Sequence, residues 1–221
     1  MEHASETRKP LYIAIEGVIG VGKTSLVRLL RDAFQCNQLL EVFEENPFLS
    51  DFYSDRARYA FQTQIFFLLS RYQQQQKTIP DALAAGHIIF SDYTFDKDAL
   101  FASINLNGDE LRMYQRVHEA LGEKIPEPNL LVYLRASTET LMQRILHRDR
   151  PYERDMERAY IDELNQAYES FFAEPRWKNR LLVIETDNLN PIANPDDLAF
   201  VIQRIRETLQ LAPYQQSLPL I

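Results

Sequence analysis

The segment Gly17-Val18-Ile19-Gly20-Val21-Gly22-Lys23-Thr24 fits the pattern G-x-x-x-x-G-K-[ST] at every fixed position. It contains three of the six glycines in the 221-residue chain. An apolar run at residues 11–15 precedes it and predicts a buried strand, and residues 25–31 follow it with helical spacing. A strand, a glycine-rich loop and a helix in this order aim backbone N–H groups and a helix N-terminus at phosphate. The sequence therefore predicts a loop that binds a nucleoside triphosphate.

Two side chains of this loop suit the triphosphate and its metal ion. Lys23 is expected to reach the β- and γ-phosphates, and the hydroxyl of Thr24 is expected to be a ligand of Mg²⁺. The whole loop, Gly17 to Thr24, is predicted to bind the phosphates of ATP. The motif leaves open what happens to the phosphate afterwards.

The composition suits one globular domain and excludes several other classes of protein. Hydrophobic residues make up 45% and charged residues 25% of the chain, so we treat residues 1–221 as a single domain. The formal net charge of −8 argues against nucleic acid as a general partner. The polar first ten residues predict no signal peptide, and no apolar run approaches the roughly 18 residues of a membrane helix. A single cysteine, Cys36, suits a reducing compartment, and we expect a cytoplasmic protein.

Short apolar runs alternate with helical patterns along the chain. The predicted strands are residues 11–15, 39–43, 86–92, 130–134 and 181–184. The predicted helices are residues 25–31, 56–76, 96–103, 109–121, 137–148, 155–172 and 195–209. This order predicts an α/β fold with a five-stranded parallel sheet and helices on both faces. Ligands of such folds bind at the carboxyl ends of the strands.

Acidic residues follow two of these strands. Asp92 ends the third strand and is expected to hold Mg²⁺ together with Thr24, although it could instead cap the next helix. Glu44 ends the second strand and is our candidate to accept a proton from the phosphate acceptor. Glu45 is the alternative, because neighbouring strand residues point in opposite directions.

Basic residues cluster around residues 147–156, which is unusual in an acidic chain. Arg144 and Arg148 are one helical turn apart, and Arg150 follows just before Pro151 ends the helix. Guanidinium groups match phosphate oxygens with a planar fork of donors. We interpret the segment as a lid whose arginines close over ATP, with a solvated helix end as the alternative.

These motifs together resemble the deoxyribonucleoside kinases, in particular the deoxyadenosine, deoxyguanosine and deoxycytidine kinase branch. The resemblance covers residues 11–155 and implies a P-loop kinase fold. The segment Phe43-Glu44-Glu45-Asn46-Pro47-Phe48-Leu49 resembles the family's acidic segment, which implies that Glu44 is the base toward the 5′-hydroxyl. The resemblance implies lid arginines at Arg144, Arg148 and Arg150. It also implies nucleoside-binding roles for further residues: Tyr53 and Glu153 at the sugar 3′-hydroxyl, Gln64 and Arg71 at the base, and Asp98 behind Arg71.

One position departs from the family pattern. The family usually has an acid-Arg-Ser triplet after the third strand, whereas this chain has Asp92-Tyr93-Thr94. The acid is kept, but the arginine that would help hold the 5′-oxygen is missing.

The resemblance implies transfer of the γ-phosphate of ATP to the 5′-hydroxyl of a 2′-deoxynucleoside, with Mg²⁺ as cofactor and a homodimer as the assembly. The amide of Gln64 can pair with adenine or cytosine, and with guanine if Arg71 and Asp98 assist, and we favour a purine. One alternative is a nucleoside monophosphate kinase of the thymidylate kinase type, which the acidic segment around Glu44 disfavours. Another is a non-catalytic switch that uses a nucleotide to order a binding loop.

Overall fold

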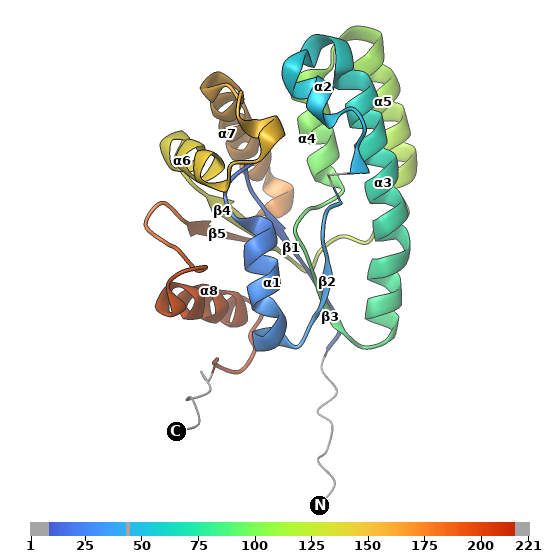
Figure 1. Ribbon diagram of the computed structural model, residues 1–221. Helices are drawn as coiled ribbons and strands as arrows, with labels where there is room; N and C mark the ends of the chain where they lie inside the picture. The colour runs from blue at the N-terminus through green and yellow to red at the C-terminus, as the bar shows by residue number, and fades with distance from the viewer. Residues whose placement is uncertain (1–8, 43–44, 215–221) are drawn as a thin grey trace, which may run out of the picture.

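A parallel sheet of five strands forms the centre of the computed structural model, which describes residues 9–42 and 45–214 (Figure 1). The strands are β1 (Leu11–Glu16), β2 (Asn37–Leu39), β3 (Ile88–Ser91), β4 (Leu130–Arg135) and β5 (Leu181–Glu185). Their order across the sheet is β2-β3-β1-β4-β5, and every neighbouring pair is parallel. This confirms the predicted α/β fold.

Helices cover both faces of the sheet. They are α1 (Lys23–Phe34), α2 (Leu49–Ser54), α3 (Arg56–Ala84), α4 (Asp96–Asn105), α5 (Gly108–Gly122), α6 (Thr138–Arg148), α7 (Arg158–Phe172) and α8 (Pro195–Thr208), with 3₁₀ turns η2 (Pro151–Glu153) and η3 (Pro175–Trp177). Helices α1 and α8 lie on one face, and α3 lies on the other with α4 and α5 packed against it (Figure 1). No helix of the described residues is long and apolar enough to cross a membrane.

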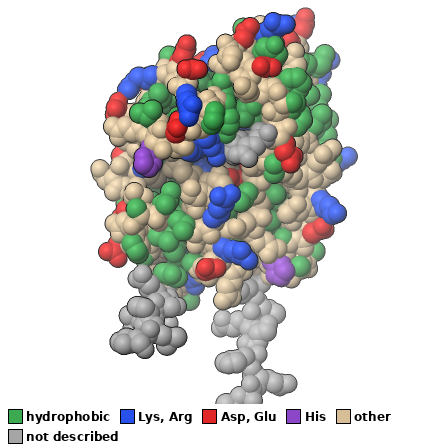
Figure 2. All heavy atoms as spheres, viewed as in Figure 1, with side chains coloured by type: hydrophobic (Ala, Val, Ile, Leu, Met, Phe, Trp, Pro, Cys, Tyr) green, Lys and Arg blue, Asp and Glu red, His purple; other side chains and the backbone are tan. Residues whose placement is uncertain are grey.

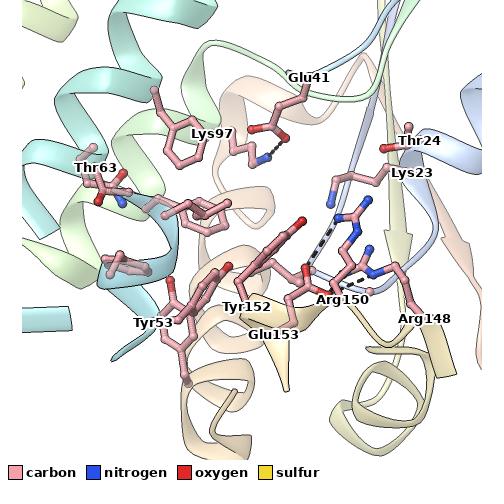
Figure 3. Close-up of a pocket in the computed structure, with 18 of the residues that line it drawn as sticks. Lys23, Thr24, Glu41, Tyr53, Thr63, Lys97, Arg148, Arg150, Tyr152 and Glu153 are labelled. Atoms are coloured by element: carbon pink, nitrogen blue, oxygen red, sulfur yellow. Dashed lines mark hydrogen bonds and ion pairs between the residues drawn. The ribbon is translucent and has the colours of Figure 1, made fainter. Parts of the chain in front are cut away.

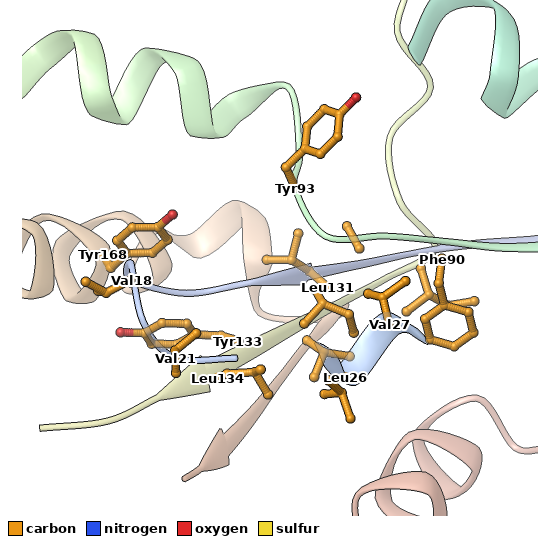
Figure 4. Close-up of a cluster of buried hydrophobic side chains, with 14 of the residues drawn as sticks. Val18, Val21, Leu26, Val27, Phe90, Tyr93, Leu131, Tyr133, Leu134 and Tyr168 are labelled. Carbon is orange, nitrogen blue, oxygen red and sulfur yellow. The ribbon is translucent and has the colours of Figure 1, made fainter. Parts of the chain in front are cut away.

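The core explains why the strands read as continuous apolar runs. Every residue of β1 is buried, because helices cover both faces of the central strands. Leu26 and Val27 of α1 pack toward the sheet, where they belong to the same buried cluster as Phe90 and Leu131 (Figure 4). This packing fixes α1, and hence the loop before it, against the carboxyl end of β1.

The second strand differs from the prediction of residues 39–43. It spans Asn37–Leu39, and its partner β3 ends at Ser91, so the chain beyond Leu39 has no strand to pair with. The carboxylate of Asp92 accepts the backbone N–H of Glu41 instead, at 2.8 Å. The chain therefore leaves the sheet earlier than its apolar pattern suggests, and Glu41 follows the strand end.

Two further differences concern helices. The helix predicted for residues 56–76 continues to Ala84, and Gln75 within it is fully buried. The short helix α2 was not predicted. At the start of α6, the hydroxyl of Ser137 caps the helix by accepting the N–H of Thr140 at 3.3 Å.

Candidate active site

Two cavities lie side by side at the carboxyl edge of the sheet. The inner cavity, which is the pocket drawn in Figure 3, extends between α2, α3, α4 and the lid. The outer cavity lies over the phosphate-binding loop and the start of α1. Six residues line both: Gly20, Lys23, Thr24, Glu41, Arg148 and Arg150. A ligand in one cavity would meet a ligand in the other at this shared wall.

The phosphate-binding loop needs glycine at two positions for steric reasons. Gly17 has φ +149°, and a Cβ there would lie 2.5 Å from the carbonyl oxygen of Leu134. Gly20 has φ +89°, and its Cβ would lie 2.7 Å from Cγ1 of Ile145. Any side chain would therefore displace the loop from β4 or from α6. Helix α1 begins directly after the loop, at Lys23, so its free N–H groups face the outer cavity.

Lys23 and Thr24 lie where the motif predicts. The Nζ of Lys23 donates to the carbonyls of Gly17 at 2.7 Å and Val18 at 3.2 Å. Burial and the neighbouring Lys97 lower the pKa of Lys23 to about 8. Basic side chains occupy the middle of this face of the molecule (Figure 2), and Arg28, Arg148 and Lys23 line the outer cavity. This local positive charge suits a triphosphate even though the chain is acidic overall.

Asp92 lies beside Thr24, as predicted. The Thr24 hydroxyl donates to one carboxylate oxygen of Asp92, and the other oxygen accepts the N–H of Glu41. Asp92 does not cap the next helix, because α4 has Phe95 at its N-cap position and no side-chain cap. The structure thus brings two oxygen-bearing side chains together next to the phosphate-binding loop.

Glu41 is the carboxylate that the structure places in the shared wall (Figure 3). Its Oε1 accepts from Nε of Arg71 at 3.0 Å, and its Oε2 accepts from Nζ of Lys97 at 2.7 Å. Burial raises the pKa of the Glu41 carboxyl, but Arg71 and Lys97 outweigh burial and hold this pKa well below its usual range. Glu41 is therefore ionised at neutral pH. Glu44, the predicted base, lies outside the described residues, and Glu45 is exposed.

Gln64 and Arg71 line the inner cavity, and Asp98 lies buried behind Arg71. Gln64 is 2% exposed, and its Oε1 has no hydrogen-bond partner among the described residues. Arg71 forms ion pairs with both Asp98 and Glu41, and its guanidinium lies 4.5 Å from the ring centroid of Phe67. One fixed guanidinium therefore joins the predicted base-reading residues to the carboxylate of the shared wall.

Tyr53 and Glu153 also line the inner cavity, on its lid side. The ring of Tyr53 stacks on that of Tyr152, with centroids 6.1 Å apart and planes 14° from parallel. Glu153 is buried and accepts from Nε of Arg148 at 3.1 Å, and it lies 3.6 Å from Arg150 (Figure 3). These contacts hold the predicted lid, residues 147–156, over both cavities.

Arg144 lines neither cavity, unlike the other two predicted lid arginines, Arg148 and Arg150. Its guanidinium donates to the hydroxyl of Thr186 at 3.1 Å, to the carbonyl of Leu189 at 3.1 Å and to that of Val21 at 3.4 Å. It therefore ties the phosphate-binding loop to the segment after β5. Helical spacing correctly predicts that Arg144 lies on one face with Arg148. Spacing alone cannot show that carbonyl oxygens of the protein already accept the N–H donors of Arg144.

Sequence reasoning missed two residues of the shared region, Glu41 and Lys97. Glu41 belongs to the same acidic segment as Glu44 and Glu45, but the strand predicted for residues 39–43 placed it inside the strand and not after its end. Lys97 stands between Asp96 and Asp98 in the first turn of α4, a pattern typical of an exposed helix start. It is nevertheless only 7% exposed and lines the inner cavity.

Comparisons with known proteins give a consistent result. Residues 13–210 match the family described as deoxynucleoside kinase. The chain is 32% identical over 203 residues to a deoxyguanosine kinase from Bacillus subtilis, which covers 90% of this chain and 97% of that one. It is 31% identical over 204 residues to a deoxyadenosine kinase from Dictyostelium discoideum, with 90% and 80% covered.

A solved structure of deoxyadenosine kinase from M. mycoides, with dCMP and dCDP bound, shares the fold with a TM-score of 0.77. It is 23% identical, and the match covers 89% of this chain and 100% of that one.

Proposed function

The chain belongs to the deoxynucleoside kinase family, and we propose that it transfers the γ-phosphate of ATP to the 5′-hydroxyl of a purine 2′-deoxynucleoside. Membership makes it a phosphotransferase that phosphorylates deoxynucleosides. One observation carries the detailed proposal: two cavities share a wall that contains the loop lysine, a carboxylate and two arginines. The triphosphate would occupy the outer cavity and the deoxynucleoside the inner one.

The inner cavity holds charges of both signs. Its lining contains two carboxylates, those of Glu41 and Glu153, both paired with protein cations, and five basic side chains: Lys23, Arg71, Lys97, Arg148 and Arg150. The charge of the cavity therefore does not decide between a nucleoside and a nucleoside monophosphate as acceptor. Family membership is what argues against a monophosphate kinase of the thymidylate kinase type. A switch without a transferred group would not need the buried amide of Gln64 at the far end.

A purine is favoured by the base-reading residues and by the relatives. The free Oε1 of Gln64 offers an acceptor for the exocyclic amino group of adenine, and the same amide carries donors for a ring nitrogen. Both relatives described above are named as purine deoxynucleoside kinases. The aromatic rings of Tyr53 and Tyr152 close the lid side, where the sugar would lie.

We assign the proton-accepting role to Glu41 on geometric grounds. It is ionised, only 12% exposed and part of the shared wall, which is where the 5′-hydroxyl must meet the γ-phosphate. Because the transition state is loose, the hydroxyl proton leaves late, so a carboxylate with a low pKa suffices. Lys23, Arg148 and Arg150 surround the position of the transferred group and would stabilise its charge.

The residues present fit Mg²⁺. Thr24 and Asp92 together offer a hydroxyl and a carboxylate beside the phosphate-binding loop, and Mg²⁺ prefers oxygen ligands. The described residues contain no group of three or more His, Cys, Asp or Glu that could hold a metal by themselves. This suits an ion that is held by one or two side chains and by substrate phosphates. When bound, Mg²⁺ would neutralise charge on the phosphate oxygens.

A homodimer in the cytoplasm remains our expectation from the resemblance. On α5, Tyr114 is fully buried, and Leu111 and Val117 pack against the core, so this stripe faces inward. Met113 on α5 is 57% exposed and Leu69 on α3 is 45% exposed. These two helices pack together, and their outer side is where we would place a subunit contact.

The proposal is tested by incubating the protein with ATP, Mg²⁺ and a panel of the four deoxynucleosides and thymidylate. We expect 5′-monophosphates to form, with the highest kcat/KM for deoxyadenosine or deoxyguanosine. A higher kcat/KM for deoxycytidine or thymidine than for both purines would refute the purine assignment. Phosphorylation of thymidylate alone would refute the acceptor class.

A further inference from the structure

Lys97 is a buried cation that the mechanism above does not use. It lies in the first turn of α4 and is 7% exposed, and its side chain reaches the wall of the inner cavity (Figure 3). Lysine is almost never this buried unless it is paired. Its partner is Oε2 of Glu41, 2.7 Å from Nζ. Glu41 is the carboxylate that we propose accepts the proton, so Lys97 lies next to the place where phosphoryl transfer would occur.

Charged groups from three other segments of the chain lie around this lysine. Glu41 follows β2 and pairs with it directly. Lys97 also acts electrostatically on Glu16 at the end of β1 and on Lys23 at the start of α1. The charged neighbours of Lys97 are therefore two acidic side chains, Glu16 and Glu41, and one basic side chain, Lys23.

The loop after β3 supplies no cation to this place. At position 93 the side chain is a tyrosine that points away from the sheet (Figure 4), and its hydroxyl donates to Oε1 of Gln74 on α3 at 2.6 Å. Thr94 turns the other way and donates its N–H and its hydroxyl to Glu16, at 2.6 and 2.9 Å. Positive charge reaches Glu41 from this part of the chain through Lys97, four residues beyond Tyr93.

We propose that Lys97 binds the attacking 5′-oxygen of the deoxynucleoside beside Glu41 and stabilises the charge that develops there during phosphoryl transfer. An ammonium group has three N–H donors, and the bond to Glu41 occupies one of them. A hydroxyl that donates its proton to Glu41 would bring its oxygen next to the same ammonium group. As the proton passes to Glu41, the bond between the 5′-oxygen and the γ-phosphorus forms, and the bond between that phosphorus and the oxygen that leaves with ADP breaks. Lys97 stabilises the negative charge that the carboxylate and the 5′-oxygen share during this transfer.

This inference rests on the proposed function, and its test separates the two. The variants are Lys97→Met, which removes the charge, and Lys97→Arg, which keeps it, with Lys77→Met as the matched control. Lys77 is an exposed lysine of α3 that lines neither cavity. Steady-state kcat and KM for deoxyadenosine and ATP are measured, together with thermal stability and the Kd of ATP.

We expect Lys97→Met to lower kcat on the order of 10²-fold, as removal of one transition-state donor does, with the Kd of ATP changed less than threefold. Lys97→Arg should retain at least a tenth of wild-type turnover, and Lys77→Met should match the wild type. A second readout is binding of 2′,5′-dideoxyadenosine, which lacks the 5′-hydroxyl. Lys97→Met should weaken binding of deoxyadenosine but not of this analogue.

Less than a tenfold loss of kcat in folded Lys97→Met would overturn the inference, and so would equal weakening of both nucleosides. If Lys97→Met does not fold, Lys97→Gln replaces it, and failure of both would show that the ammonium group is structural. A wild-type protein that phosphorylates no deoxynucleoside refutes the proposed function itself. An active wild type with an equally active Lys97→Met refutes only the role of Lys97.

Discussion

Replacing Gln64 with leucine should make the protein more stable and a poorer enzyme. The side chain is 2% exposed, and its Oε1 has no hydrogen-bond partner among the described residues. A buried polar atom without a partner costs about 1–3 kcal/mol. Leucine has a similar size and no polar atom, so Gln64→Leu removes this cost. A gain of about 1 kcal/mol corresponds to ~2–4 °C in Tm for a chain of this length.

The same change should cost substrate affinity. If Gln64 binds the base, its loss removes about 1–3 kcal/mol of binding, which is roughly a 5- to 150-fold rise in KM for the deoxynucleoside. The kcat should change little, because the base contact is equal in the ground and transition states. The assay combines thermal unfolding of the ligand-free protein with steady-state kinetics on deoxyadenosine and deoxyguanosine.

Gln75 provides the matched control on the same helix. It is fully buried, and neither polar atom of its side-chain amide has a hydrogen-bond partner among the described residues, but it lines neither cavity. Gln75→Leu should therefore raise Tm in the same way and leave KM unchanged. If Gln64→Leu is no more stable than the wild type and its KM is unchanged, the side-chain amide of Gln64 does not bind the nucleobase. If both variants raise KM equally, the effect comes from α3 as a whole.

The remaining predictions concern the shared wall and the phosphate-binding loop. Glu41→Gln should lower kcat about 10²–10⁴-fold while the protein still binds ATP, and Glu44→Gln should keep near-normal turnover. If steady-state assays show the opposite pattern, Glu44 is the proton acceptor. Because the pKa of Lys23 in the free protein is about 8 instead of 10.5, Lys23 loses its proton as pH rises through 8, whereas a bound triphosphate favours the charged form. ATP affinity should therefore fall above pH 8, and binding of ATP at pH 9 should take up a proton. Calorimetry in two buffers of different ionisation enthalpy would detect this proton. If no proton is taken up, the lowered pKa of Lys23 is wrong. Arg144→Ala should raise the KM for ATP about tenfold, because it removes a hydrogen bond that holds the phosphate-binding loop. Arg148→Ala should lower kcat instead. A similar loss of kcat in both variants would indicate that Arg144 contacts the phosphates directly.

The sequence was sufficient for the fold because its signals are local. The glycine pattern from Gly17 to Thr24 demands a particular backbone, and each buried strand is a continuous apolar run. The end of β2 could not be predicted, since it depends on where the partner strand β3 stops and on the carboxylate of Asp92, which accepts the N–H of Glu41. Because the strand was predicted to reach residue 43, the expected base was placed at Glu44 and Glu41 was not considered. Glu44 itself lies outside the described residues.

The site residues show the same division between local and distant causes. Gln64 and Arg71 could be placed together because helical spacing puts them on one face of α3. Lys97 gave no signal, because its burial depends on Glu41, which is 56 residues away in the chain. Arg144 has the right spacing for a lid arginine, but its donors are used by carbonyls of a loop that follows β5.

The charged cluster formed by Glu41 of the shared wall and three neighbouring side chains is better explained by function than by stability. Two carboxylates, Glu41 and Asp98, face two cations, Arg71 and Lys97, and all four are largely buried. Buried ion pairs often stabilise a protein no better than apolar residues of the same size, because desolvation offsets their attraction. The cluster has no net charge, so it presents no unfavourable field to an uncharged nucleoside. Each member can nevertheless change its hydrogen bonds when charge develops in the cavity. Arg71 bonds both carboxylates, so a nucleobase that contacts its guanidinium also affects the position and charge of Glu41, which we propose accepts the proton. The cluster thereby links recognition of the nucleobase, at one end of the cavity, to phosphoryl transfer at the other.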